Sequence, residues 1–299
     1  MLTFVRSNHP KNRSLAGFSL TAAIVLSNMA LSSVAAQQPL SPGLPFKRGE
    51  ELIYQAEFKK GLLRGVDVAE FTYRADVERA PTDVWSNLPL IRLVGDVVTK
   101  GFFIGLVGYH FHEHVESSVT PSARFPMFDS NPFNVLHTGK IEERGKREWT
   151  SDAVFNHQTR EVAWTMHEVN QNQTAQTTTI QFSEPIQDVL TVIYFLRTQR
   201  LEVGKSFDVP LTDSGRVFRL SVAVLERKKI STVIGRVDAF RIEPGIFGDS
   251  GLVRSRGQFS IWITDDDRHL PVKAQLKVDL GTFDIKLKRL SFPETRQAR

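Results

Sequence analysis

Apolar and polar residues alternate along most of the chain from residue 51 onwards, and this alternation is the strongest structural signal in the sequence. Successive side chains of a β-strand point to opposite faces, so a period of two predicts strands with one buried face. The clearest run has apolar residues at Phe218, Leu220, Val222 and Val224. Further runs at residues 259–263, 272–278 and 283–290 predict a three-stranded meander. The chain is therefore predicted to be mainly β, with one large antiparallel sheet.

One segment follows a helical period instead. Its apolar residues recur at spacings of three and four, at Ile186, Val189, Leu190, Ile193 and Leu196. Pro185 would occupy the first turn, and Arg197 and Arg200 would lie at the C-terminal end, where positive charge suits the helix dipole. We therefore expect one α-helix near residues 185–199, packed across the sheet. A long antiparallel sheet covered in this way often curls into a half-barrel or a barrel-like form with an apolar interior.

The first 36 residues differ from the rest of the chain. Three basic residues, Arg6, Lys11 and Arg13, precede a mostly apolar run from Leu15 to Ala30, and small residues follow at positions 33–36. A basic start, a short apolar stretch and a small-residue exit are typical of a cleaved signal peptide. The uninterrupted apolar stretch is shorter than the ~20 residues of a membrane span, which favours cleavage over an anchor.

These features predict a signal peptide at residues 1–36, a flexible leader at 37–47, a single β-rich domain at 48–292 and a C-terminal tail at 293–299. The mature protein is then expected in the periplasm and not as an integral membrane protein. The chain has no cysteine, so neither lipidation at a cysteine nor disulfides can occur. Of its 38 basic residues, the signal peptide removes three, which leaves 35 against 33 acidic ones and no basic stripe to suggest nucleic-acid binding.

Three histidines alternate on one predicted strand, at His110, His112 and His114. Their imidazoles would share one face and could bind zinc or copper. The first and last would lie about 13 Å apart, so one ion could not reach all three without a bulge, and two of them with His137 or His157 form the alternative set. A polar, solvent-facing strand explains the same pattern. Glu113, between the histidines, completes the one cluster that suggests acid–base catalysis.

An apolar segment at residues 101–108 precedes the histidines and is rich in glycine. Its apolar residues include Phe102, Phe103, Ile104 and Leu106. Glycine allows either a bent strand in the core, which is the favoured interpretation, or a lip over an apolar cavity. In the second case these four side chains would contact an apolar ligand.

Three stretches of sequence carry a family resemblance. They are Phe46–Tyr54 (FKRGEELIY), Val203–Pro210 (VGKSFDVP) and Gly257–Val272, which contains IWITDD and LPV. In this order and spacing they resemble the bacterial family known as domain of unknown function 3108 (DUF3108), over nearly all of residues 46–290. The resemblance implies an exported, antiparallel β protein of the cell envelope. The family has no agreed activity or catalytic residues, so it assigns no role to any residue here.

Taken with export, these patterns favour a non-catalytic protein of the cell envelope that binds an apolar ligand or takes part in envelope assembly. Its partner would be a lipid, an acyl chain or an envelope polypeptide, and no cofactor is expected. Two alternatives use the strand from His110 to His114. One is a hydrolase of envelope material, with Glu113 and the histidines as acid and base, and the other is a metal-binding protein.

Overall fold

The structure is a computed structural model. It describes residues 44–78, 90–101, 110–122, 131–169, 174–249 and 251–292. By their contacts the residues divide into two units, 1–36 and 37–299, and every described residue belongs to the second unit. The predicted signal peptide, most of the predicted leader and the predicted C-terminal tail lie outside the described residues and stay predictions. No helix in the described part is long and apolar enough to cross a membrane.

Fourteen strands and one short helix make up the described part of the chain. The strands are β1 (Glu50–Lys60), β2 (Leu63–Glu78), β3 (Leu90–Thr99), β4 (Phe111–Pro121), β5 (Phe133–Arg144), β6 (Arg147–Asn156), β7 (Glu161–Glu168), β8 (Gln176–Gln181), β9 (Ser206–Asp213), β10 (Arg216–Thr232), β11 (Gly235–Pro244), β12 (Gly257–Thr264), β13 (Pro271–Val278) and β14 (Gly281–Ser291). The helix is α2 (Thr191–Leu196). The prediction of a mainly β chain is confirmed, and β12–β14 form the predicted meander.

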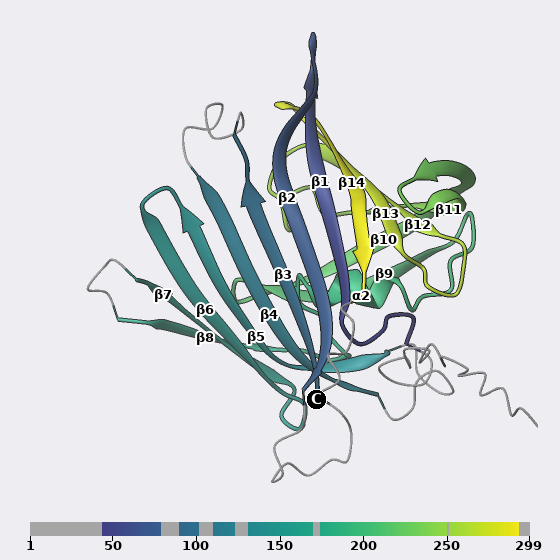
Figure 1. Cartoon of the computed structure of the whole chain (residues 1–299). Helices are drawn as coiled ribbons and strands as arrows, with labels where there is room; N and C mark the ends of the chain where they lie inside the picture. The colour runs from purple at the N-terminus through teal and green to yellow at the C-terminus, as the bar shows by residue number, and fades with distance from the viewer. Residues whose placement is uncertain are drawn as a thin grey trace, which may run out of the picture. The chain divides into compact units, whose positions relative to one another are not determined.

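The described strands form one antiparallel sheet with the order β8-β7-β6-β5-β4-β3-β2-β1-β14-β13-β12-β11-β10-β9 (Figure 1). Neighbours in sequence pair with each other within each half, and the halves join where β1 pairs with β14. Strand β1 shows why apolar and polar residues alternate along the chain: every second side chain is buried. Its buried positions include Leu52, Tyr54, Ala56 and Phe58, and the residues between them are partly exposed.

The sheet curls until strands from its two ends approach each other. β7 and β8 lie at one end of the strand order, and the β9–β10 turn lies at the other. At this turn Gly215 sits so close to the Trp164 ring of β7 that a Cβ atom there would be 2.9 Å from it. At the end of β9, Asp213 Oδ1 lies 3.9 Å from Nζ of Lys140 on β5. These contacts confirm the predicted barrel-like curl.

The helix is shorter than predicted. The apolar stripe predicted a helix near residues 185–199, and α2 occupies only the middle of that range. The backbone of Gln187 explains the late start, because its N–H donates to Pro210 and its carbonyl accepts from Thr212, at 2.9 and 2.8 Å, which holds it extended beside β9. Pro185 consequently precedes the helix instead of occupying its first turn. The stripe is still buried, at Ile186, Leu190 and Leu196.

Asp188 fixes the start of the helix. Its side chain is buried, and its Oδ1 accepts the N–H groups of Leu190 and Thr191 at 2.8 and 2.7 Å. Its Oδ2 accepts the hydroxyl groups of Ser117 on β4 and Thr138 on β5, at 2.8 and 2.5 Å. A buried carboxylate is costly unless its oxygens accept hydrogen bonds. These four donors therefore tie the first turn of α2 to the sheet.

Arg197 fixes the other end of the helix. It directly follows α2, and its side chain is fully buried. The guanidinium donates to both carboxylate oxygens of Glu50 at the start of β1. It also donates to two main-chain carbonyl groups, those of Pro45 and Arg268, at 3.1 and 3.2 Å. The sequence pattern assigned Arg197 to the helix dipole, and the structure adds a buried ion pair that reaches across the chain.

Replacing Arg197 by methionine should destabilise the protein strongly, because the carboxylate of Glu50 would stay buried without its cation. Removing one partner of a buried pair costs about 3–5 kcal/mol of unfolding free energy. Urea denaturation followed by tryptophan fluorescence measures this loss. The double variant Arg197→Met/Glu50→Gln should recover much of it, since neither charge then remains.

The matched control is Arg200→Met. The Arg200 side chain is 90% exposed and pairs with Glu202 at the surface, so its loss should cost no more than about 1 kcal/mol. Equal losses for the two arginine variants would show that the buried pair does not fix the helix.

Candidate apolar binding site

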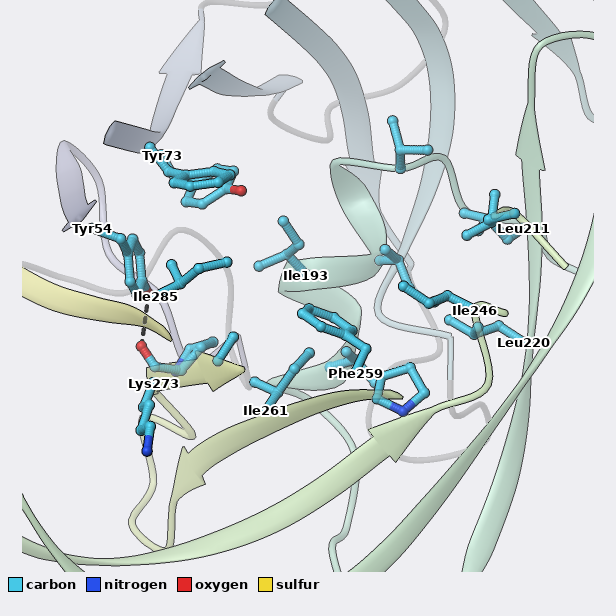
Figure 2. Close-up of a pocket in the computed structure, with 18 residues that line it drawn as sticks. Tyr54, Tyr73, Ile193, Leu211, Leu220, Ile246, Phe259, Ile261, Lys273 and Ile285 are labelled. Atoms are coloured by element: carbon cyan, nitrogen blue, oxygen red, sulfur yellow. Dashed lines mark hydrogen bonds between the residues drawn. The ribbon is translucent and has the colours of Figure 1, made fainter. Parts of the chain in front are cut away.

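A cavity of about 250 Å³ lies between α2 and the strands that the helix covers. Figure 2 shows side chains from the helix and from the sheet converging on it. The cavity is lined by Tyr54, Phe71, Tyr73, Val189, Val192, Ile193, Leu196, Leu211, Leu220, Pro244, Ile246, Leu252, Phe259, Ile261, Pro271, Lys273, Ala274 and Ile285. Nearly all of these side chains are aliphatic or aromatic, as in sites that hold apolar ligands.

The register of the strands explains why this space stays open. Ala274 of β13 lies opposite Ile261 of β12 and Ile285 of β14, so the three side chains point to the same face. An alanine between two isoleucines leaves a gap in the row. Ile193 of α2 faces the row from the helix side (Figure 2). The anchored helix spans the gap without filling it.

The described part of the lining contains three side chains with polar groups. The two tyrosines are neutral, and the ammonium group of the lysine points away from the cavity. The hydroxyl of Tyr54 donates to the carbonyl of Pro271 at 2.7 Å. Burial raises the pKa of Tyr54 and of Tyr73 well above the ordinary value of 10.0, so both phenols stay protonated at neutral pH. The ammonium group of Lys273 points away from the apolar side chains (Figure 2) and lies 4.5 Å from the centroid of the Trp262 ring. The described lining therefore presents apolar surface without a facing charge.

The described residues of the lining are not those proposed from sequence as ligand contacts. Those contacts, Phe102, Phe103, Ile104 and Leu106, lie outside the described residues, so their role stays a prediction. The observed lining includes three residues of the helical stripe, Val189, Ile193 and Leu196. The sequence pattern assigned this stripe to core packing. An apolar stripe indicates burial, and it does not distinguish a filled interior from an open one.

Two of the three predicted histidines share a face. His112 and His114 lie on β4 and both approach Asp96 of β3, with nitrogen–oxygen distances of 3.9 and 2.7 Å. His110 precedes the strand and is exposed. Within the described residues, no group of three or more His, Cys, Asp or Glu side chains could hold a metal ion. The metal hypothesis stays a prediction.

The alternative third ligands have other partners. Nε2 of His137 lies 3.0 Å from a carboxylate oxygen of Asp152 on β6. Nε2 of His157 donates to the main-chain oxygen of Val135 at 2.6 Å. In the described part of the chain, neither ring completes a metal-ligand group with the β4 histidines.

Glu113 points to the opposite face from the two histidines. Its carboxylate lies 3.4 Å from Nζ of Lys140 on β5. Desolvation raises the pKa of Glu113, and the nearby carboxylates of Glu142 and Asp213 add to this against the effect of Lys140. The structure therefore does not bring Glu113 together with His112 and His114, as the predicted acid–base cluster requires.

The pH dependence of stability should reveal the partners of His114. Desolvation lowers the pKa of His114, but hydrogen bonds to Asp96 and Glu116 outweigh this and raise it above 6.5. A raised pKa in the folded state adds stability below the unfolded pKa, and this stability is lost as pH rises through the folded pKa. His114→Gln should therefore reduce the unfolding free energy most below about pH 6, and least in alkaline solution.

Urea denaturation between about pH 5.5 and about pH 8.5 measures this trend. His110→Gln, which removes an exposed histidine just before the strand, is the control. A loss in His114→Gln that does not change with pH would contradict the assigned ion pairs.

Three solved structures are similar to most of this chain. A β-barrel-like protein of the domain of unknown function DUF1849 from Brucella abortus has a TM-score of 0.46 at 11% identity, covering 83% of this chain and 100% of that one. A candidate exported protein with a YmcC-like fold from Bacteroides fragilis has a TM-score of 0.31 at 8% identity, covering 83% and 98%. A candidate lipoprotein from Parabacteroides distasonis has a TM-score of 0.31 at 11% identity, covering 85% and 100%. Likenesses this distant carry no argument about the activity of this chain.

No curated protein matches the chain. The family described as "Protein of unknown function (DUF3108)" matches residues 53–288, a range that contains every residue lining the cavity. This match confirms the resemblance found in the sequence. The chain therefore belongs to the DUF3108 family.

Proposed function

We propose that the chain is an exported protein of the cell envelope that binds the apolar part of a lipid, such as a single acyl chain, in the cavity beneath α2, without catalysing a reaction. The observation that carries the proposal is the chemistry of the lining. The described residues around a space of about 250 Å³ are apolar except for two protonated tyrosines and a lysine whose charge points elsewhere. Covering such a surface with an apolar ligand is favourable because it removes apolar area from water. The surface offers a substrate no reactive group.

The size of the cavity limits the ligand. An apolar cavity of about 150 Å³ binds benzene, and pockets for drug-sized ligands span roughly 300–1,000 Å³. The space here, of about 250 Å³, lies between these values. It therefore suits one acyl chain, or part of one, rather than a lipid with two chains.

Export is supported by the sequence of residues 1–36, with its basic start, apolar run and small-residue exit. The absence of cysteine from the whole sequence agrees with a periplasmic protein that is not lipidated at a cysteine. An envelope location would also place the protein among acyl-chain lipids.

The hydrolase alternative has less support. Hydrolysis needs a nucleophile or an acid–base pair that converges on one cleft. Glu113 lies with Lys140 on one face of β4, while His112 and His114 lie with Asp96 on the other. We therefore retain only the binding function.

A series of straight-chain fatty alcohols should measure the depth of the cavity. Burying one methylene group contributes about 0.8 kcal/mol, so affinity should rise up to about fourfold per carbon and then level off once the chain fills the space. Isothermal titration calorimetry of the purified protein provides the affinities. Affinity that does not depend on chain length would exclude the cavity as the binding site.

Filling the gap at Ala274 should block binding. Ala274→Leu places a larger side chain between Ile261 and Ile285, so affinity for the longest bound alcohol should fall at least about tenfold, while filling of the cavity keeps the protein as stable as before or more so. Ala223→Leu, the same change on β10 outside the lining, is the control. Undiminished binding in a folded Ala274→Leu protein would contradict the proposal.

A further inference from the structure

A second space, of about 500 Å³, lies between the tip of the β10–β11 hairpin and strands β12–β14. β11 pairs with β12 only through Ala239–Ile242, while its pairing with β10 continues to Gly235. The hairpin tip is therefore not paired with β12, and it reaches the space that β14 also lines. We call this space the lysine groove. It is lined by Lys228, Ile230, Ser231, Thr232, Val233, Trp262, Val272, Lys273, Lys286, Leu287 and Lys288.

Positive charge exceeds negative charge around the groove. Its four lysines are Lys228, Lys273, Lys286 and Lys288. Glu226 pairs with the first at 2.8 Å, and Glu57 is shared by the last two at 2.6 and 3.5 Å. Lys273 has no salt bridge to a described residue. Desolvation and three neighbouring lysines lower its pKa, against the opposing effect of the Asp284 carboxylate. The groove is therefore short of anionic partners.

Trp262 is buried against the groove between two of these cations. Its ring centroid lies 4.5 Å from Nζ of Lys273 and 5.6 Å from Nζ of Lys228. Its Nε1–H is buried and has no acceptor among the described residues. Buried indole N–H groups usually have a hydrogen-bond partner. An anionic ligand would supply the missing negative charge.

We propose that the lysine groove binds a phosphate monoester, carried either by a free sugar or by a lipid headgroup. Lysines bind phosphate as point charges, and several ammonium groups suit a dianion better than a single carboxylate. The apolar floor of Trp262, Val272 and Leu287 would pack against the carbon skeleton. A volume of about 500 Å³ exceeds what inorganic phosphate needs and falls within the usual range for small ligands.

This groove is distinct from the apolar cavity. Lys273 and Ala274 are neighbours on β13, so their side chains point to opposite faces of the strand. The ammonium group of Lys273 accordingly points away from the cavity (Figure 2). The proposal therefore does not rest on the acyl-chain function, and either can fail without the other.

Titration of the purified protein with four probes tests the proposal. The probes are glucose 6-phosphate, glucose, vesicles of phosphatidylcholine with phosphatidic acid, and vesicles of phosphatidylcholine alone. At least one of the two probes with a phosphate monoester should bind, and neither of the two probes without one should, as measured by calorimetry and vesicle sedimentation. Binding of the sugar phosphate identifies a soluble ligand, and binding only to the phosphatidic acid vesicles identifies a headgroup. Failure of both monoester probes, glucose 6-phosphate and the phosphatidic acid vesicles, overturns the proposal.

Matched lysine variants separate the groove from general surface charge. Lys273→Gln and Lys286→Gln should each weaken binding at least about tenfold. Lys277→Gln removes the same charge from the same strand outside the groove and should change affinity less than about threefold. An equal loss in Lys277→Gln would overturn the proposal. Urea midpoints check folding, and Lys286→Gln serves alone if Lys273→Gln is unfolded.

Discussion

The burial of two ions, Asp188 and Arg197, is the constraint on which the rest of the structure depends. Neither charge can leave water without full compensation, so each must find its partners in a fixed geometry. Asp188 takes hydroxyl donors from β4 and β5, and Arg197 takes the carboxylate of Glu50 on β1. The two ends of a helix of six residues are thereby attached to different strands. A helix this short has little stability of its own, so these attachments and its packing hold it in place.

A fixed helix and a fixed register together account for the cavity. Helix α2 cannot move closer to the sheet without breaking its buried contacts, and the sheet cannot fill the gap because Ala274 stands between two isoleucines. Protein interiors are otherwise close-packed, and an apolar space of about 250 Å³ forfeits dispersion contacts along its whole lining. An apolar ligand restores those contacts, which is the physical reason to connect the cavity with binding.

The strands could be predicted from the sequence because they follow a local periodicity of apolar and polar residues. Alternation located strands such as β1 and β10, and the family resemblance agreed with the match over residues 53–288. The start of the helix was predicted too early because Gln187 pairs with β9, a contact that local periodicity does not reveal. Arg197 and Glu50 are 147 residues apart, and no local pattern links them. The candidate sites were missed for the same reason: cavity and groove both depend on which side chains adjacent strands place together, and the described lining of each comes from distant segments.

Strand β13 shows how one element separates two chemistries. Pro271 and Ala274 of this strand line the apolar cavity, Val272 lines the lysine groove, and Lys273 lines both, so a single strand separates a site governed by apolar area from one governed by charge. The two respond differently to solution conditions, since salt screens the ammonium groups of the groove and leaves the uncharged cavity nearly unaffected. Lys273 is the residue that both linings share, and its charge is directed to only one of them. Placing the charge on the Trp262 side keeps the cavity free of an ion whose desolvation would oppose the burial of an acyl chain.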